Sequence, residues 1–126
     1  PGRLEILSFD PLVFIDGAHN HQAAEMLVEN LDALCTCSPA KGKERILLFG
    51  MHDGKLSEKE QQKFFSAFDA VYRISVQDEE DDAVITAMGK AMDEADLAHP
   101  DAMFVAAGSL YLLDGASRWL ENRRIH

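Results

Sequence analysis

Apolar residues follow two alternating patterns along this chain, short runs and stripes of helical period. The short runs predict strands at residues 4–9, 12–15, 45–50, 70–76 and 103–106. Spacings of three and four residues predict helices at 23–34, after 57, at 84–92 and at 110–120. After the second strand, strands and helices therefore alternate, as they do in proteins with a parallel sheet.

Polar residues mark where these elements begin. Asn20 is placed to cap the first helix, and Ser57 with Glu60 three residues later forms the sequence of a capping box. Asp10-Pro11 is a turn pair between the first two strands, which are too close for a parallel crossover and must pair antiparallel or lie in line. The acidic run at 78–82 precedes the third helix, where carboxylates interact favourably with the helix dipole.

Together these elements predict one α/β domain with a Rossmann-like fold. We expect a mostly parallel sheet with helices on both faces and an antiparallel edge strand at the N-terminus. The strand at 45–50 is apolar over most of its length, which predicts an interior position. Every strand-to-helix loop of such a sheet leaves from its carboxyl edge, so loops 16–20, 50–55 and 108–109 should meet there if their strands are neighbours.

Composition and charge narrow the range of partners. The chain has 126 residues, enough for about one domain, and 47% are hydrophobic and 27% charged, as in a folded soluble protein. With 12 Lys and Arg against 22 Asp and Glu the net charge is −10, and an evenly acidic surface would repel nucleic acid and anionic membranes. No apolar run approaches the roughly 18 residues that span a bilayer, and no leader opens the chain, so a cytoplasmic location is expected.

The sequence offers no evident metal site and no complete nucleotide site. Cys35 and Cys37 are too close for an unstrained mutual disulfide and are expected to be reduced thiols. The five histidines do not combine with them at zinc-ligand spacing. The motifs GxGxxG and GxxxxGK[ST] are both missing, so any nucleotide site must be completed by another part of the protein. The chain begins at Pro1 rather than Met, and we expect it to be a piece of a longer protein.

Three polar residues fall on the predicted carboxyl edge, where helix N-termini suit an anionic ligand such as a carboxylate or phosphate. Asp16 could hydrogen-bond sugar hydroxyls or hold a metal-bound water, or it could cap its own turn. His19 could be a general acid or base, a residue that orients a ligand, or a solvated loop residue. Ser109 is expected to cap a helix unless a ligand lies beside it. Tyr111 and Trp119 lie on a helix of core periodicity and are expected to pack.

Four segments, in this order, resemble the C-terminal domain of folylpolyglutamate synthase. They are Pro1-Gly2-Arg3, the strand ending in Asp16-Gly17-Ala18-His19-Asn20, the strand ending in Leu48-Phe49-Gly50-Met51, and Ala107-Gly108-Ser109-Leu110-Tyr111-Leu112. The family includes the bacterial bifunctional dihydrofolate synthase/folylpolyglutamate synthase and lies within the Mur ligase superfamily. The likeness runs from the first residue nearly to the last, and Asp-Gly-Ala-His-Asn is its most specific part.

The resemblance implies an ATP-dependent ligase of folate biosynthesis that joins the amino group of L-glutamate to a carboxyl group of a folate or pteroate. In this family ATP with magnesium (Mg²⁺) first phosphorylates the carboxylate, and the amine then attacks the acyl phosphate. The phosphate-binding loop and the metal ligands belong to the family's central ATPase domain. That domain, L-glutamate and folate are the implied partners, and residues 1–126 alone are expected to be inactive.

The resemblance also implies roles for single residues. Arg3 would reach ATP across the cleft, and Asp16 would hydrogen-bond the ribose hydroxyls. His19, the implied catalytic residue, and Asn20 would line the cleft where the phosphates and the incoming glutamate meet. Ser109 would help to form the glutamate pocket.

The sequence departs from the family's pattern in two loops. His21 stands where the family usually has proline, which would preset the first helical turn. Residues 52–55 read His-Asp-Gly-Lys where the family commonly has Asp-Lys-Asp, so no role is carried onto Asp53 or Lys55. Two alternative functions are a cell-wall Mur-type amino acid ligase domain and a non-catalytic binding or regulatory module with the same fold.

Overall fold

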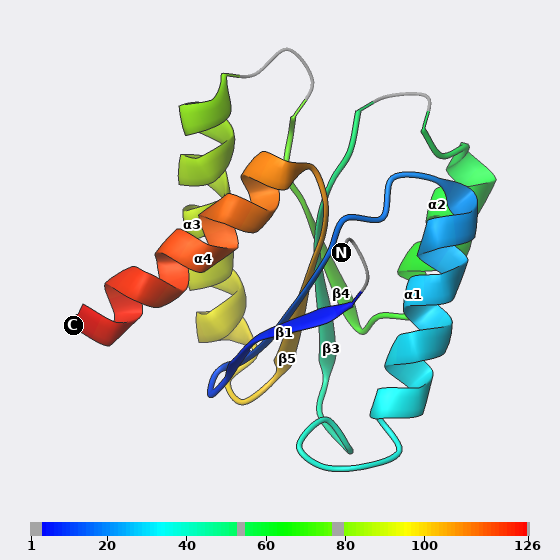
Figure 1. Ribbon diagram of the computed structural model, residues 1–126, viewed down its shortest axis with the longest axis horizontal. Coiled ribbons are helices and arrows are strands. Elements are labelled where there is room, and N and C mark those ends of the chain that lie inside the picture. The colour runs from blue at the N-terminus through cyan, green and yellow to red at the C-terminus, as the bar shows by residue number, and fades with distance from the viewer. Residues whose placement is uncertain (1–3, 53–54, 77–79, 126) are drawn as a thin grey trace.

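A computed structural model describes residues 4–52, 55–76 and 80–125 of the chain (Figure 1). Within these residues, five strands form one sheet: β1 (Glu5–Phe9), β2 (Leu12–Asp16), β3 (Arg45–Gly50), β4 (Ala70–Arg73) and β5 (Met103–Gly108). The same residues contain four helices: α1 (His21–Leu34), α2 (Glu58–Phe65), α3 (Asp81–Ala98) and α4 (Leu110–Ile125). Arg3 and Asp53 lie outside the described residues.

The strands follow the order β1-β2-β5-β3-β4 across the sheet. β2, β5, β3 and β4 run parallel to one another, whereas β1 pairs antiparallel with β2 at one edge. The predicted α/β fold with an antiparallel N-terminal edge strand is therefore confirmed. β3 lies between β5 and β4 and is buried from residue 46 to residue 50, which confirms its predicted interior position.

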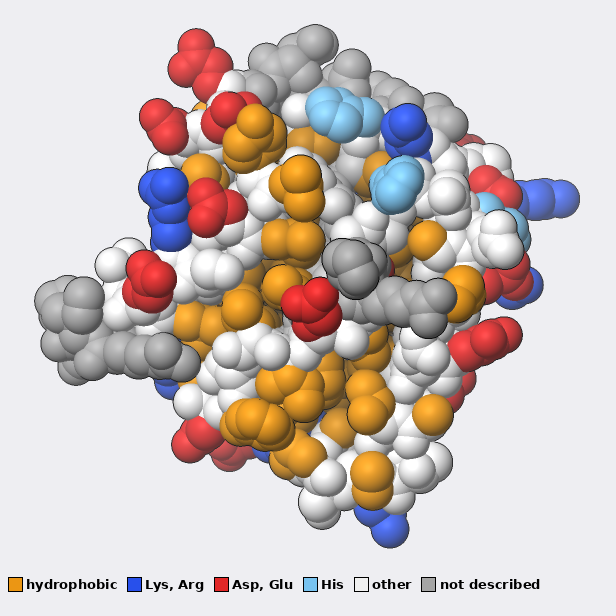
Figure 2. All heavy atoms as spheres, in the orientation of Figure 1, with side chains coloured by type: hydrophobic (Ala, Val, Ile, Leu, Met, Phe, Trp, Pro, Cys, Tyr) orange, Lys and Arg blue, Asp and Glu red, His pale blue; other side chains and the backbone are white. Residues whose placement is uncertain are grey.

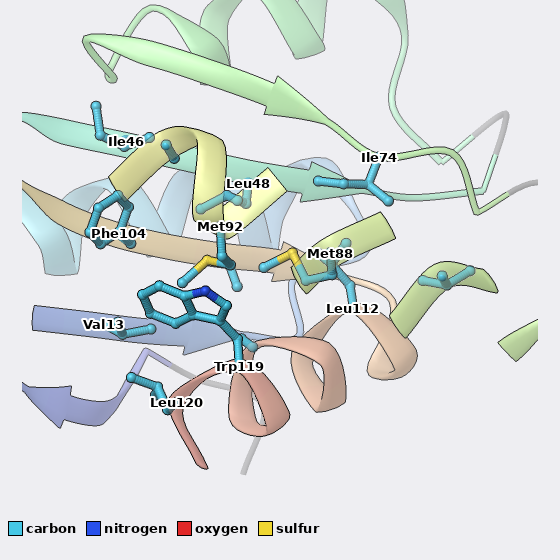
Figure 3. Packing of buried hydrophobic residues seen from close by; sticks show 14 of the residues in the cluster. Val13, Ile46, Leu48, Ile74, Met88, Met92, Phe104, Leu112, Trp119 and Leu120 are labelled. Carbon is cyan, nitrogen blue, oxygen red and sulfur yellow. The ribbon is translucent and has the colours of Figure 1, made fainter. Parts of the chain in front are cut away.

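Helices cover both faces of the sheet, as predicted. In Figure 1, α3 and α4 lie on one side of the sheet and α1 and α2 on the other. Because successive side chains of a strand point to opposite faces, Phe104 belongs to the core under α3 and α4, and Val105 to the core under α1 and α2. Figure 3 shows Trp119 of α4 beside Met88 and Met92 of α3 in the first of these cores.

Capping residues begin two helices as the sequence predicted. Asn20 Oδ1 accepts a hydrogen bond from the backbone N–H of Ala23 at 2.8 Å. Ser57 Oγ accepts from the N–H of Glu60 at 3.1 Å, and Glu60 Oε1 accepts from the N–H of Ser57 at 2.9 Å, which completes the capping box. These bonds satisfy backbone donors that have no partner inside the helix, so the starts of α1 and α2 are specified locally.

Three details differ from the prediction. β4 ends at Arg73 instead of residue 76, because β3, its paired neighbour, ends at Gly50. α4 continues to Ile125 instead of residue 120. The third difference lies in the same helix, where Tyr111, which was expected to pack, is exposed and its neighbour Leu112 is buried completely.

The surface is not evenly acidic, contrary to the expectation from net charge. Figure 2 shows apolar side chains gathered over the centre of the face that β1 crosses, with charged side chains mainly around them. Ile6 and Phe9 of β1 are both exposed, because an edge strand has a neighbour on one side only. In the described part of the chain, no helix combines the length and the apolar character that crossing a bilayer requires.

Gly108 brings the ends of β3 and β5 together. Its φ is +117°, in the left-handed region that favours glycine. A Cβ atom at this position would lie 1.9 Å from the carbonyl oxygen of Gly50, its partner across the two strands. The next residue, Ser109, donates its backbone N–H to that same carbonyl at 2.8 Å. Any side chain at position 108 would therefore push the two strand ends apart.

Gly108→Ala should destabilise the chain by about 3 kcal/mol or more, because it combines backbone strain with a steric clash. Gly89→Ala on α3 is the matched control, since a Cβ there meets nothing within 4 Å and alanine is better than glycine in a helix by about 1 kcal/mol. Free energies of unfolding from urea titrations measure both effects. A Gly108→Ala protein as stable as the wild type would contradict this account of the strand ends.

Candidate functional site

Three strand ends meet at the carboxyl edge of the sheet, which is the upper edge in Figure 1. β2, β5 and β3 are neighbours, Asp16 pairs with Ala107, and Gly50 pairs with Gly108. Ser109 follows directly on β5, so it leaves the sheet at the same edge as Asp16. The predicted meeting of the three strand-to-helix loops is confirmed for the residues that the structure describes. We call this edge the carboxyl rim.

Asp16 is a buried acid on the carboxyl rim. The residue is 5% exposed, and its Oδ1 accepts a hydrogen bond from the N–H of Ala18 at 2.8 Å, so it does cap its own turn. Burial raises the pKa of Asp16 to about 6; the bond from Ala18 acts against this rise, and the charge of Glu5 adds to it. Among the described residues no second donor reaches the carboxyl group, and none of their buried side-chain oxygens lacks a partner. No described residue therefore donates to the other oxygen of Asp16.

His19 and Asn20 follow Asp16 in the loop and are both exposed. His19 Nδ1 lies 2.9 Å from the carbonyl oxygen of Gly17. A carbonyl oxygen can only accept, so Nδ1 is the donor in this bond and Nε2 of the neutral ring is an acceptor. The Asn20 side-chain oxygen is used by the helix cap, which leaves the amide N–H groups as its donors.

Ser109 caps α4, as the sequence predicted. Its Oγ accepts from the N–H of Tyr111 at 3.3 Å, and its carbonyl oxygen accepts from the N–H of Leu113 at 3.2 Å. The hydroxyl proton is not used by either bond. Ser109 is half-buried and can still donate a hydrogen bond to a ligand at the rim.

His21, which stands in place of the family's proline, ties the start of α1 to the start of α2. Its Nε2 lies 3.0 Å from Glu25 Oε1, one turn along α1, and its Nδ1 lies 3.5 Å from Glu60 Oε2. The backbone bond from Ser57 is the main cause that lowers the pKa of Glu60, and the charge of His21 lowers it further. Proline could form neither ion pair, so this loop is anchored by side-chain contacts instead of a preset dihedral angle.

Tyr111 was expected to pack in the core, and this prediction is wrong. The residue is 46% exposed at the start of α4, and a hydrogen bond with Asp81 raises its pKa. Trp119 confirms the same prediction, since it is 8% exposed and donates to Asp93 Oδ1 at 2.8 Å. Helical periodicity cannot separate the two residues, because it does not show which of them the rest of the fold covers.

Most of the concave surface lies away from the rim. A hollow of about 170 Å³ lies between α1 and α2, and one of about 640 Å³ lies between α3 and α4. A smaller hollow of about 60 Å³ opens at the carboxyl edge between β3 and β4, and Arg73, which the sequence analysis did not single out, lines it. Where the chain is described, no group of three or more His, Cys, Asp or Glu side chains could hold a metal ion. The rim is thus an open surface with polar groups, not an enclosed pocket.

Three solved structures that match the chain are structures of folylpolyglutamate synthase. No family model and no curated protein matches the chain. The apo form of folylpolyglutamate synthase from Lactobacillus casei matches with a TM-score of 0.66 and 25% identity, over 97% of this chain and 27% of that one. A second structure of that synthetase matches with a TM-score of 0.64 and 26% identity, over 96% of this chain and 28% of that one. A folylpolyglutamate synthase complex with AMPPCP matches with a TM-score of 0.62 and 24% identity, over 97% of this chain and 28% of that one.

The chain is structurally similar to folylpolyglutamate synthase. The resemblance stated from the sequence is therefore confirmed by the structure. The chain spans about 27% of the length of the synthase that it matches, and this share is consistent with the C-terminal domain alone. Asp16, His19, Asn20 and Ser109, the described residues for which the resemblance implied a role, all lie on the carboxyl rim.

Asp16→Asn should stabilise the chain at neutral pH by about 1–3 kcal/mol, because asparagine keeps the acceptor for Ala18 and has no charge to bury. The folded pKa of about 6 lies above the ordinary value of 3.8, so between these two pH values the folded state holds a proton that the unfolded state has lost. Wild-type stability therefore falls, relative to the variant, from about pH 4 to about pH 6 and then stays level.

Free energies of unfolding across this pH range measure the difference between the two proteins. Asp114→Asn is the matched control, because Asp114 is partly exposed on α4, far along the chain from the rim loop. A stability difference for Asp16→Asn that stays constant from about pH 4 to about pH 6 would show that burial does not control this carboxyl group.

Proposed function

We propose that this chain is the C-terminal, glutamate-ligase domain of a folylpolyglutamate synthase or bifunctional dihydrofolate synthase. In this proposal the whole protein uses ATP and Mg²⁺ to join L-glutamate to a carboxyl group of a folate or pteroate. One observation carries it: Asp16, His19 and Ser109, distant in sequence, lie on one rim of a fold that matches the synthase over 97% of the chain. The synthase complex with AMPPCP supports a nucleotide as one ligand of the whole protein.

Asp16 would bind the ribose of ATP through its second carboxyl oxygen. Its first oxygen already accepts from Ala18, and hydroxyl groups are donors that would satisfy the second. A buried carboxylate without enough donors is unfavourable, so hydrogen bonds from a ligand would stabilise its ionised form. The same carboxylate could instead hold a metal-bound water, which is the second ligand that its chemistry allows.

His19, Asn20 and Ser109 would serve the incoming L-glutamate and the phosphates. Because His19 Nδ1 donates to Gly17, Nε2 is the ring nitrogen that can take a proton from the attacking amine. The amide N–H groups of Asn20 and the hydroxyl proton of Ser109 are donors suited to phosphate and carboxylate oxygens. Arg3 completes the proposed set as the residue that reaches ATP.

The chain fits ATP as one wall of a site and not as a whole site. It brings helix N-termini and Asp16 to the rim, but it has no phosphate-binding loop, and its described residues hold no metal cluster. When bound, ATP supplies the phosphoryl group that turns a carboxylate oxygen into a good leaving group. The residues of this chain would bind the ribose and orient the amine of L-glutamate. The central ATPase domain of the same protein would hold the phosphates and Mg²⁺.

The isolated chain should show no ligation when it is mixed with ATP, Mg²⁺, L-glutamate and a folate, because the phosphate-binding loop lies in another domain. Incorporation of radiolabelled glutamate into folate measures this activity. Turnover by the chain alone would refute the proposed division between the two domains. In the complete protein, ligation to a cell-wall precursor in place of folate would favour a Mur-type ligase, and ligand binding without any ligation would favour a regulatory module.

In the complete polypeptide that carries this domain, Asp16→Ala should raise the KM for ATP about tenfold to a hundredfold, the effect of losing hydrogen bonds to a charged group. The KM for folate should change little, because Asp16 touches the ribose only. Initial rates at varied ATP and varied folate separate the two constants, and Asp114→Ala on α4 is the control. An unchanged KM for ATP would overturn the ribose role.

A further inference from the structure

Arg73 differs from the other arginines whose side chains the structure describes. Three of them form ion pairs with aspartates, at distances of 2.6 to 3.4 Å: Arg45, Arg118 and Arg123. Arg73 forms no ion pair with any residue in the described ranges. Instead its Nη2 donates to Gln61 Oε1 at 3.2 Å, and its Cζ lies 5.7 Å from the centre of the Phe65 ring. The contacts that the described residues make with the guanidinium therefore hold it in place without neutralising it.

Arg73 lines the small hollow of about 60 Å³ at the carboxyl edge. Residues 50–52 at the exit of β3 and Gln61 of α2 form other parts of its wall. Gly50 belongs both to this hollow and to the proposed glutamate site, because its carbonyl oxygen accepts from the N–H of Ser109 at 2.8 Å. The hollow therefore continues the carboxyl rim toward β4.

The size and chemistry of the hollow suit a single carboxylate group. The hollow of about 60 Å³ exceeds the roughly 10–15 Å³ that one water needs, so it has room for a small polar group. A guanidinium presents parallel N–H groups that match the two oxygens of a carboxylate, and the bond to Gln61 uses only part of them. On a chain of net charge −10, a cation that no described carboxylate neutralises would attract an anion to this place.

The position of Arg73 decides which of the two carboxylates of L-glutamate it can bind. β4 lies two strands from β5, so Arg73 is displaced by about 10 Å along the rim from the strand that carries Ser109. The α-carboxylate is attached to the carbon that bears the attacking amine and must stay beside it. The side-chain carboxylate is the group that can extend toward β4.

We propose that Arg73, oriented by Gln61 and Phe65, binds the side-chain carboxylate of the incoming L-glutamate and selects for a dicarboxylic amino acid. This inference rests on the proposed function, since it names a specificity residue for the same site. A phosphate group shares the oxyanion chemistry that a guanidinium recognises, so the test compares the two anions.

Titration of the ¹⁵N-labelled chain, followed by NMR, tests the proposal with L-glutamate, L-glutamine and inorganic phosphate as probes. L-glutamate should shift the Arg73 Nε–Hε signal and the amide signals of residues 50–52. L-glutamine, which lacks only the side-chain carboxylate, should bind about tenfold more weakly, the effect of losing a hydrogen bond to a charged group. Arg73→Gln should remove this preference, whereas Arg118→Gln, on α4, should keep it.

Equal responses to L-glutamate and L-glutamine in the wild type would overturn the proposal, as would a stronger response to phosphate than to L-glutamate. An unchanged preference in Arg73→Gln would also overturn it, and a dispersed wild-type-like spectrum shows that this variant is folded. The readout needs neither ATP nor turnover. If the complete protein joins no L-glutamate to a folate while the wild-type chain still prefers L-glutamate over L-glutamine, the proposed ligase function fails and the carboxylate site at Arg73 remains.

Discussion

The close approach of β3 and β5 at their carboxyl ends is the constraint on which the rim depends. The carbonyl oxygen of Gly50 accepts from Ser109, and Gly108 leaves no room for a Cβ between the two strands. β2 pairs with β5 in parallel register, so Asp16 reaches the same edge. Backbone hydrogen bonds between buried strands therefore set the spacing of the candidate residues. Side chains in the loops, such as His21, can differ from the family's pattern without moving the strand ends.

Asp16 is unfavourable for the stability of the chain by itself. A rise in pKa from 3.8 to about 6 corresponds to about 3 kcal/mol against the ionised form at neutral pH. A neutral side chain with one acceptor would cap the same turn without that cost. Buried groups with strongly shifted pKa values are concentrated at functional sites. Hydrogen-bond donors on a ligand would offset the burial of this carboxylate, which gives a physical reason for an acid at the end of β2.

The hydrogen-bonding groups of the rim change from an acceptor at one end of the sheet to donors at the other. Asp16 on β2 offers an acceptor at one end, Arg73 on β4 offers donors at the other, and Ser109 lies between them on β5. Three strand spacings separate the ends, about 14 Å. An acceptor suits a ligand rich in hydroxyl groups, and a guanidinium suits a carboxylate, so two different ligands would be placed side by side. Such an order agrees with the proposed function, in which a nucleotide and an amino acid bind at one rim.

Local chemistry is what the sequence by itself determined. The Asn20 cap, the capping box of Ser57 and Glu60, and the alternation of strands with helices were all predicted, because each depends on hydrogen bonds or periodicity within a few residues. The α/β class and the carboxyl rim followed from that alternation, since every parallel strand of such a sheet ends at the same edge.

Strand order and burial were decided only by the tertiary structure. The last strand, β5, inserts between β2 and β3, and this pairing of distant segments places Ser109 beside Gly50. Tyr111 and Trp119 lie on the same helix, yet only Trp119 is buried. The shifted pKa of Asp16 likewise arises from burial among segments that meet only after folding, because desolvation depends on all neighbours in space and not on neighbours in sequence.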